Sequence, residues 1–106
     1  MKTYLISQVE VIDADAWYQY RALAAPAIAK FGGRYLVRGA RPEVIEGEDW
    51  APPAADSQQL IVAEFPTNLA IHAWYKSSDY AKALAYRQLA VRRRLLFVDG
   101  VDGQDS

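Results

Sequence analysis

The 106-residue sequence contains no cysteine, one histidine and one methionine. The lack of cysteine excludes a disulfide framework, a thiolate nucleophile and any zinc or iron-sulfur site that uses thiolates. It also fits a reducing compartment, so we expect a cytoplasmic protein. No run of 18 apolar residues occurs, and no transmembrane helix is predicted. Ser7, Gln8 and Glu10 interrupt the apolar N-terminal run where a signal peptide needs an unbroken one, so we predict a strand there.

An excess of charge of either sign is also lacking. Twelve Lys and Arg residues stand against thirteen Asp and Glu residues, and the formal net charge is -1. We therefore expect neither nucleic acid nor an anionic membrane as a partner. Three consecutive arginines at 92–94 form the one basic run, but strand alternation would send Arg93 to the opposite face from its neighbours. A solvated or dimer-rim role is predicted for this run.

Familiar catalytic motifs are missing as well. The sequence has no Gly-rich phosphate loop, no G-x-S-x-G elbow, no H-E-x-x-H and no EF-hand loop. We therefore predict no metal site and no bound cofactor. An apolar fraction of 52% with 24% charged residues is typical of a globular chain, and 106 residues fit one domain. The prediction is a single domain over 1–106, with an irregular loop at 47–57 and a frayed tail at 100–106.

Periodicity predicts four strands and two helical crossovers. The strands are expected at 3–12, at 34–39 with a continuation at 43–47 after a bulge, at 59–65 and at 93–99. Asp13 should cap a helix from 14, kinked or restarted near Pro26 and ended by Gly32 or Gly33. Thr67 and Ser77 should cap two further helical segments, at 68–76 and 78–90.

The order strand-helix-strand, strand-helix-strand predicts an α+β, ferredoxin-like βαββαβ fold. Right-handed crossovers would place the helices on one face of a four-stranded antiparallel sheet and leave the other face bare. Most of the predicted strands carry apolar residues on both faces, as in TYLISQVEVI at 3–12. Burial of the bare face against a second copy is the simplest solution, so we predict a homodimer. Trp50, in the irregular loop, is expected to pack on its own domain or on the partner subunit.

Several short motifs together resemble a known family. They are Tyr20-Arg21, Ala25-Pro26, the run Gly32-Gly33-Arg34-Tyr35-Leu36-Val37-Arg38-Gly39, Glu46-Gly47, Trp50, Glu64-Phe65-Pro66, Trp74-Tyr75, Ser77, Tyr80 and Arg87. On these residues the chain resembles the family known as domain of unknown function 1330, in the dimeric α/β-barrel superfamily. The resemblance covers nearly the whole chain. It implies the ferredoxin-like fold and a dimer, and it implies no reaction.

Three charged residues lie within otherwise apolar or structured segments: Arg38, Glu64 and Arg87. A charge beside a buried surface normally has a partner, and Arg38 and Glu64 lie on strands that should pair as a hairpin. One interpretation is a structural ion pair between them. The other is a clamp in which the guanidinium of Arg38 binds an anion or a carbonyl group of a ligand.

Aromatic residues gather on the second crossover, where Trp74, Tyr75 and Tyr80 span its two helical segments. They are predicted either to pack in the core or to form the lip of an apolar pocket between the sheet and this crossover. His72, the single histidine, is a candidate proton carrier, although a lone helical histidine is more often structural or solvated.

Three functions remain open at this point. The first is an enzyme without metal or cofactor, acting on a small aromatic, lactone or carboxylate substrate by analogy with the superfamily. There Arg38 would hold a carbonyl or carboxylate group, Glu64 would fix Arg38, and His72 or Tyr75 would move a proton. The second is a non-catalytic protein whose ligand-binding residues are drawn from Arg38, Glu64, Trp74, Tyr75, Tyr80 and Arg87. The third is a structural dimer, which predicts a pocket too small for any ligand.

Overall fold

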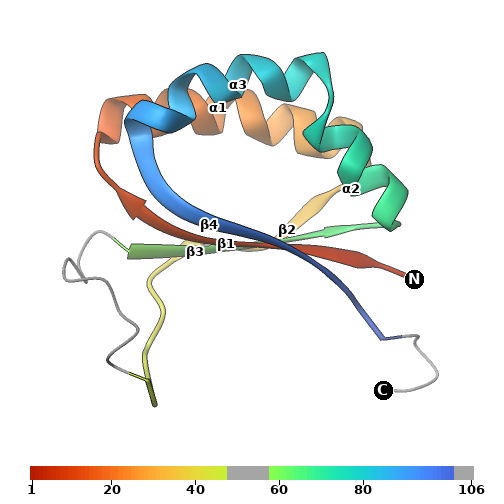
Figure 1. The fold of residues 1–106 in the computed structure, drawn as a ribbon, viewed down its shortest axis with the longest axis horizontal. Helices are drawn as coiled ribbons and strands as arrows, with labels where there is room; N and C mark the ends of the chain where they lie inside the picture. The colour runs from red at the N-terminus through yellow and green to blue at the C-terminus, as the bar shows by residue number, and fades with distance from the viewer. Residues whose placement is uncertain (48–57, 102–106) are drawn as a thin grey trace.

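The computed structural model describes residues 1–47 and 58–101, which form four strands and three helices (Figure 1). In chain order they are β1 (Thr3–Val11), α1 (Ala14–Lys30), β2 (Arg34–Ala40), β3 (Gln58–Phe65), α2 (Asn68–Tyr75), α3 (Ser78–Ala90) and β4 (Val91–Asp99). The predicted loop around Trp50, at 48–57, and the end of the predicted tail, at 102–106, lie outside the described residues.

The strands form one antiparallel sheet in the order β2-β3-β1-β4, and the helices lie together on one face of it (Figure 1). This arrangement confirms the predicted ferredoxin-like α+β fold. Within 1–47 and 58–101, no helix is long and apolar enough to cross a bilayer.

Alternation along the strands separates the two faces of the sheet. Leu5, Val9, Ala63 and Phe65 point to the helices and are at most 3% exposed. The residues between them point to the face that the helices leave uncovered, and the apolar ones there are only half-buried in the single chain. They include Tyr4, Ile6, Leu60, Val62 and Leu96. Both faces are therefore apolar, as the sequence predicts.

The predicted helix starts are confirmed by their capping hydrogen bonds. The side chain of Asp13 accepts from the Ala16 amide at 3.0 Å, and the hydroxyl oxygen of Thr67 accepts from the Ala70 amide at 3.0 Å. Ser77 caps α3 in the same way, by accepting from the amide of Tyr80. These bonds satisfy amides that have no acceptor within the helix.

The end of α1 is also confirmed. Phe31 is the C-cap, and Gly32 follows with φ +84°, a left-handed conformation that glycine adopts without steric cost. The amide of Gly33 donates to the carbonyl of Ile28 at 2.9 Å, which closes the helix end.

Two predictions about chain breaks are wrong. The helix α1 does not restart at Pro26, because Ala24, Ala27 and Ile28 on both sides of it are buried against the sheet and keep the helix continuous. The strand expected at 43–47 is absent, because β2 ends at Ala40. Ala40 already pairs with Leu60, so β3 offers almost no further partner, and Pro42 has no amide hydrogen to donate. The last strand begins at Val91, two residues before the predicted start.

Candidate functional site

A small cavity lies between α1 and the helix-facing side of the sheet. Its volume is about 20 Å³, room for about one water molecule. We call it the helix–sheet cavity. Its lining residues come from α1, all four strands and α2: Leu5, Ser7, Trp17, Tyr20, Arg21, Ala24, Ile28, Tyr35, Arg38, Ile61, Trp74 and Arg93.

The secondary structure explains why these side chains meet. Trp17, Tyr20, Ala24 and Ile28 follow the three- and four-residue spacing of one helix face, and all four are buried. Strand alternation turns Ser7 to the same face of the sheet as Leu5 and Val9. The walls are therefore aromatic and aliphatic, whereas the polar groups come from single positions on different elements.

A hydrogen-bonded network closes one side of the cavity. The hydroxyl oxygens of Tyr20 and Tyr80 lie 2.8 Å apart, and the guanidinium of Arg93 donates to both of them, at 2.7 Å to Tyr20. The ring of Trp17 stacks on Tyr20, with 5.3 Å between the ring centroids. Arg93 is thus held by two neutral acceptors, and its charge stays beside the cavity.

Burial sets the protonation of this network. It raises the pKa of Tyr20 far above its usual range, and the positive charge of Arg93 offsets only part of that effect. Burial alone would lower the pKa of Arg93, but the two tyrosine oxygens outweigh it and raise that pKa. Tyr20 therefore remains a hydroxyl group and Arg93 remains a cation near neutral pH.

Five buried polar atoms have no hydrogen-bond partner among the described residues. Two are Gln59 Oε1 and Arg87 Nε, away from the helix–sheet cavity, and the other three are Ser7 Oγ, Trp17 Nε1 and Trp74 Nε1. All three belong to residues that line the helix–sheet cavity. An indole N–H can only donate, and a buried donor without an acceptor costs free energy. The cavity therefore lacks an acceptor that these groups are placed to use.

Arg38 and Glu64 do not form the predicted pair. In the strand register Glu64 lies opposite Arg34, whereas Arg38 lies opposite Ile61, three residues along β3 and on the other face of the sheet. Glu64 accepts from Arg34 Nε and from Lys2 Nζ, each at 3.1 Å. Arg38 instead lies over the ring of Tyr35, at 4.6 Å from its centroid. Both predicted roles that join Arg38 to Glu64 are wrong, because the strand register sets Arg34 opposite Glu64 and the irregularity between Tyr35 and Val37 turns Arg38 to the other face.

The aromatic residues of the second crossover are mostly core. Trp74 and Tyr80 are at most 1% exposed and pack with 4.2 Å between their ring centroids, whereas Tyr75 is 40% exposed. Only Trp74 of the three lines the helix–sheet cavity. The helix–sheet cavity thus lies against α1, and of the residues predicted to line a pocket at the second crossover it includes only Trp74.

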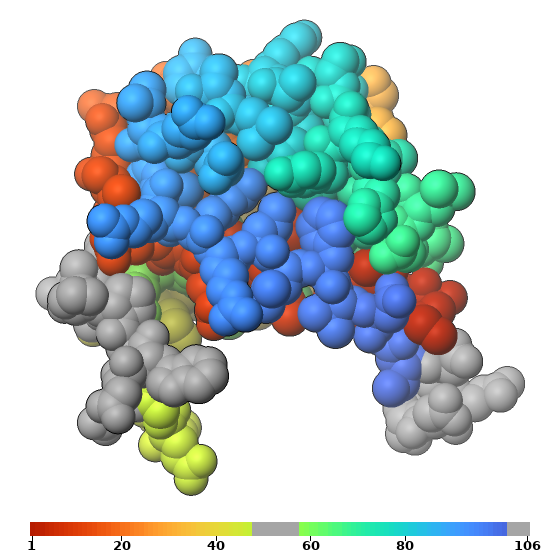
Figure 2. All heavy atoms as spheres, viewed as in Figure 1, coloured from red at the N-terminus to blue at the C-terminus, as the bar shows by residue number. Residues whose placement is uncertain are grey.

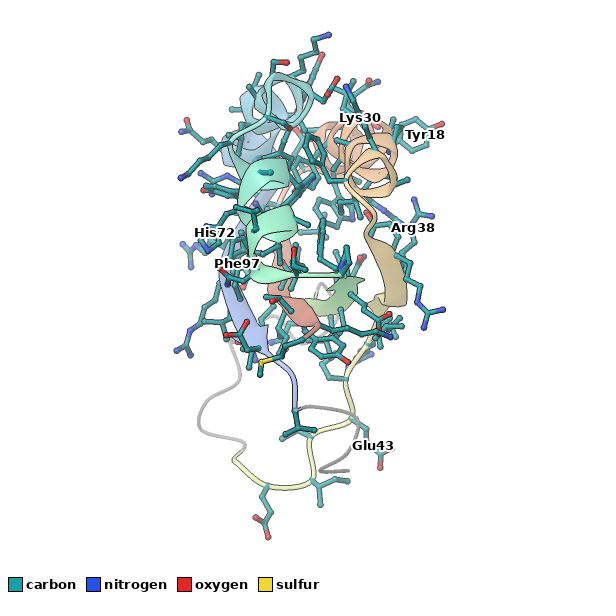
Figure 3. All side chains as sticks on the ribbon, turned by 90° about the vertical axis from the view of Figure 1, so that its right-hand side faces the viewer. Tyr18, Lys30, Arg38, Glu43, His72 and Phe97 are labelled. Carbon is teal, nitrogen blue, oxygen red and sulfur yellow. The ribbon has the colours of Figure 1, made fainter. Side chains whose placement is uncertain are left out.

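His72 and Arg87 lie away from the cavity. His72 is exposed on α2, and its ring packs edge-on against Phe97 of β4, on the opposite side of the molecule from Arg38 (Figure 3). Arg87 is half-buried on α3 and does not line the cavity. Neither His72 nor Tyr75 is placed to move a proton there.

A second, larger cavity of about 560 Å³ lies at the other face of the sheet. The ends of β1, β3 and β4 line it together with residues 42–47, and it includes Glu10, Glu46, Arg92 and Arg94. Figure 2 shows this hollow underside beside the yellow-green segment. It belongs to the uncovered apolar face, where the dimer partner is expected.

Sequence reasoning missed Arg93, Tyr20, Trp17 and Ser7 as site residues. Alternation does separate Arg93 from the exposed Arg92 and Arg94, which confirms the predicted break in the basic run. That alternation was the available signal, but no local pattern shows which tyrosines would meet Arg93. Among the described residues, no three His, Asp or Glu side chains come together as a metal site.

Comparison with known proteins fixes the family. The profile of the family described as domain of unknown function DUF1330 matches residues 2–101. The chain belongs to the DUF1330 family. Comparison with functionally curated proteins found no significant match.

Solved structures share the fold of this DUF1330 chain. A protein of unknown function from Rhodopseudomonas palustris is 19% identical, with a TM-score of 0.75 over 95% of this chain and 83% of the other. SnoaB from Streptomyces nogalater, a cofactor-independent oxygenase, is 10% identical, with a TM-score of 0.67 over 99% of this chain and 98% of the other. At these identities the likeness shows the fold alone.

Proposed function

We propose that this DUF1330 protein binds a small aromatic compound in the helix–sheet cavity and acts on it as an enzyme that needs no cofactor. One observation carries the proposal: the buried donors of Ser7, Trp17 and Trp74 line one cavity without an acceptor of their own. A carbonyl or hydroxyl oxygen of a ligand would supply that acceptor. The cavity has room for about one such oxygen, so the ring of the ligand would have to displace side chains at its rim. The fold shared with a cofactor-independent oxygenase supports the enzymatic version by analogy.

Catalysis in this cavity would depend on stabilisation of the negative charge that develops on a substrate oxygen. N–H donors and guanidinium groups that surround a substrate oxygen favour the charge that develops on it when a neighbouring bond loses its proton. Tyr20 and Tyr80 hold the guanidinium of Arg93 in place. The electrostatic potential in the cavity is therefore positive before the substrate binds, and no side chain has to move to make it so. These groups bind and polarise the substrate.

A non-catalytic binding protein is the second candidate, and the protonation of the site favours it. The described lining has no Asp, Glu or His, and the raised pKa of Tyr20 keeps its proton in place near neutral pH. A substrate would therefore have to lose its proton to a water molecule, because the described lining offers no general base. Binding without reaction needs no such step.

We also propose that the working form is a homodimer. The uncovered face of the sheet holds half-buried Ile6, Leu60, Val62 and Leu96, and Val98 on the same face is 46% exposed. An apolar sheet face of this kind is normally buried, and an identical copy covers it with one isologous contact. The hollow of about 560 Å³ beneath the sheet gives the partner room to dock.

A thermal-shift screen with small aromatic acids, ketones and phenols, followed by product analysis, tests the proposed function. A ligand that stabilises the wild type should lose its effect in the Trp74→Phe variant, which keeps the aromatic wall and removes one donor. A product formed from that ligand supports the enzyme, and binding without a product supports the second candidate. If no compound raises the melting temperature, the chain is a structural dimer, as the volume of about 20 Å³ would then indicate.

A further inference from the structure

The helix–sheet cavity is surrounded by positive charge. Arg21, Arg38 and Arg93 line it, and no Asp or Glu appears in the described lining. The whole chain has one acid more than it has bases, so this local excess of three cations does not follow from composition. It is a property of the site.

None of the three guanidinium groups has a carboxylate partner among the described residues. The ion pairs found there use Lys2, Lys30 and Arg34 instead. The three cavity arginines rest on aromatic groups: Arg21 lies 5.8 Å from the ring centroid of Trp17, Arg38 4.6 Å from that of Tyr35, and Arg93 5.3 Å from that of Tyr20. A ring face attracts a cation but leaves most of its hydrogen-bond donors unused.

The tyrosine network adds one more donor. Two hydroxyl groups carry two protons, and one of these protons is used in the hydrogen bond between Tyr20 and Tyr80. Arg93 donates to both oxygens, so it takes up none of the protons. The second hydroxyl proton has no acceptor within the described part of the chain. Together with the N–H groups of Trp17 and Trp74, the site has an excess of donors and positive charge.

From this excess we infer that the helix–sheet cavity binds an anion, namely the carboxylate group of a small aromatic acid. The inference deepens the proposed function by naming the charge of the ligand, and it rests on that function. A carboxylate offers two acceptor oxygens and a full negative charge, which match the indole donors and the guanidinium groups together. A neutral amide or alcohol of the same shape supplies acceptors without the charge.

Arg38 is the group that admits the ligand. The cavity holds about one oxygen-sized group, so the ring of an aromatic acid must displace side chains at its rim. Arg38 is exposed on β2, the edge strand of the sheet, and an irregularity in strand pairing lies directly after it. In the described structure only the ring of Tyr35 holds it. The guanidinium can therefore swing outward and return onto a bound carboxylate.

The test compares benzoate and 2-naphthoate with benzamide and 2-naphthamide, measured by titration followed with NMR of the indole N–H protons. Trp17→Phe and Trp74→Phe variants assign the two signals. We expect the carboxylates to bind at least tenfold more tightly than the amides and to move both indole signals downfield, because each N–H gains a charged acceptor. Arg38→Met should weaken carboxylate binding at least tenfold.

Arg34→Met is the matched control, since Arg34 lies on the same strand but pairs with Glu64 on the other face of the sheet. It should leave carboxylate binding unchanged. If the amides bind as tightly as the carboxylates, the inference that the cavity prefers an anion is wrong, whereas the proposed function is unaffected. Carboxylates that bind without moving either indole signal would overturn the assignment of the cavity. If neither series binds at millimolar concentration, both this inference and the proposed function fail for small aromatic ligands.

Discussion

The hydroxyl oxygens of Tyr20 and Tyr80 lie 2.8 Å apart although 60 positions separate the two residues in the chain. Tyr20 lies on α1 and Tyr80 on α3, and Arg93 of β4 donates to both. The contact thus ties both crossovers and the last strand together at one buried point. Because the three polar groups hydrogen-bond to one another, they can be buried beside the core without a carboxylate.

Replacement of Arg93 by Met should lower the free energy of unfolding by about 1.5 to 3 kcal/mol, the range for hydrogen bonds to a charged group. Both tyrosine hydroxyls would lose a donor and keep only each other. Arg92→Met is the control, because Arg92 is exposed on the other face of β4, and its effect should stay within about 0.5 kcal/mol. Urea unfolding measures both values, and equal losses would show that the network adds no stability.

Replacement of Gly33 by Ala should destabilise the protein by about 1 to 3 kcal/mol through overpacking. A Cβ at this position would come within 2.7 Å of Ile28 Cγ2 and 2.8 Å of Phe65 Cζ. A second substitution, Phe65→Leu, removes the ring that the new methyl group meets. In a double-mutant cycle the two losses should therefore sum to more than the loss of the double variant. If the two losses of stability are additive, the cost of Gly33→Ala does not come from contact with the Phe65 ring.

The Val62→Arg variant should be monomeric. Val62 pairs with Ile6 on one side and Val37 on the other, so it lies near the middle of the uncovered face. A guanidinium there would be desolvated in an isologous interface, once from each copy. Sedimentation should give about 24 kDa for the wild type, roughly twice the chain mass of 11.9 kDa, and half of that for the variant.

The Leu69→Arg variant serves as the control for the dimer, because Leu69 is 80% exposed on α2 on the helix side of the sheet. It should sediment as the wild type does. Far-UV circular dichroism of both variants checks that they are folded. A wild type that is monomeric at micromolar concentration would contradict the proposed dimer.

The pKa of Glu64 should rise in Lys2→Met and in Arg34→Met and stay unchanged in Arg38→Met. The hydrogen bond from Lys2, together with Arg34, lowers this pKa below its ordinary value, and Arg38 lies on the other face of the sheet. Carboxyl carbon chemical shifts, followed through a pH titration, measure it. If the pKa of Glu64 rose in the Arg38→Met variant, Arg38 and Glu64 would interact, contrary to the strand register.

The same carboxylate contributes to acid stability. Since its folded pKa is lowered, its contribution is present above the unfolded pKa and is lost as the pH falls through the folded pKa. The Glu64→Gln variant should therefore lose less stability than the wild type between about pH 5 and pH 3. The Glu64 side chain is only 12% exposed, but its partners Lys2 and Arg34 are surface residues, so we expect a small difference. Thermal unfolding at several pH values tests it.

The sequence by itself determined the elements and the fold class. The caps at Asp13, Thr67 and Ser77, and the end of α1 at Gly32, depend on groups within four positions along the chain, so local pattern was enough to find them. Two-faced apolar strands are also visible in the sequence, because strand alternation depends only on the next residue. Topological rules then left few ways to arrange these elements.

Only the tertiary structure decided the site. The register of β2 and β3 set Arg34, and not Arg38, opposite Glu64. The irregular pairing that follows turned Arg38 to the other face of the sheet, since a shift of one residue is enough to do so. Arg93 reaches Tyr20 across 73 positions, a meeting that depends on how α1 crosses the sheet. The continuous helix through Pro26 has the same origin, since burial on both sides outweighs one missing hydrogen bond. Such contacts form between segments remote in sequence, where local propensity carries no information about which side chains will face each other.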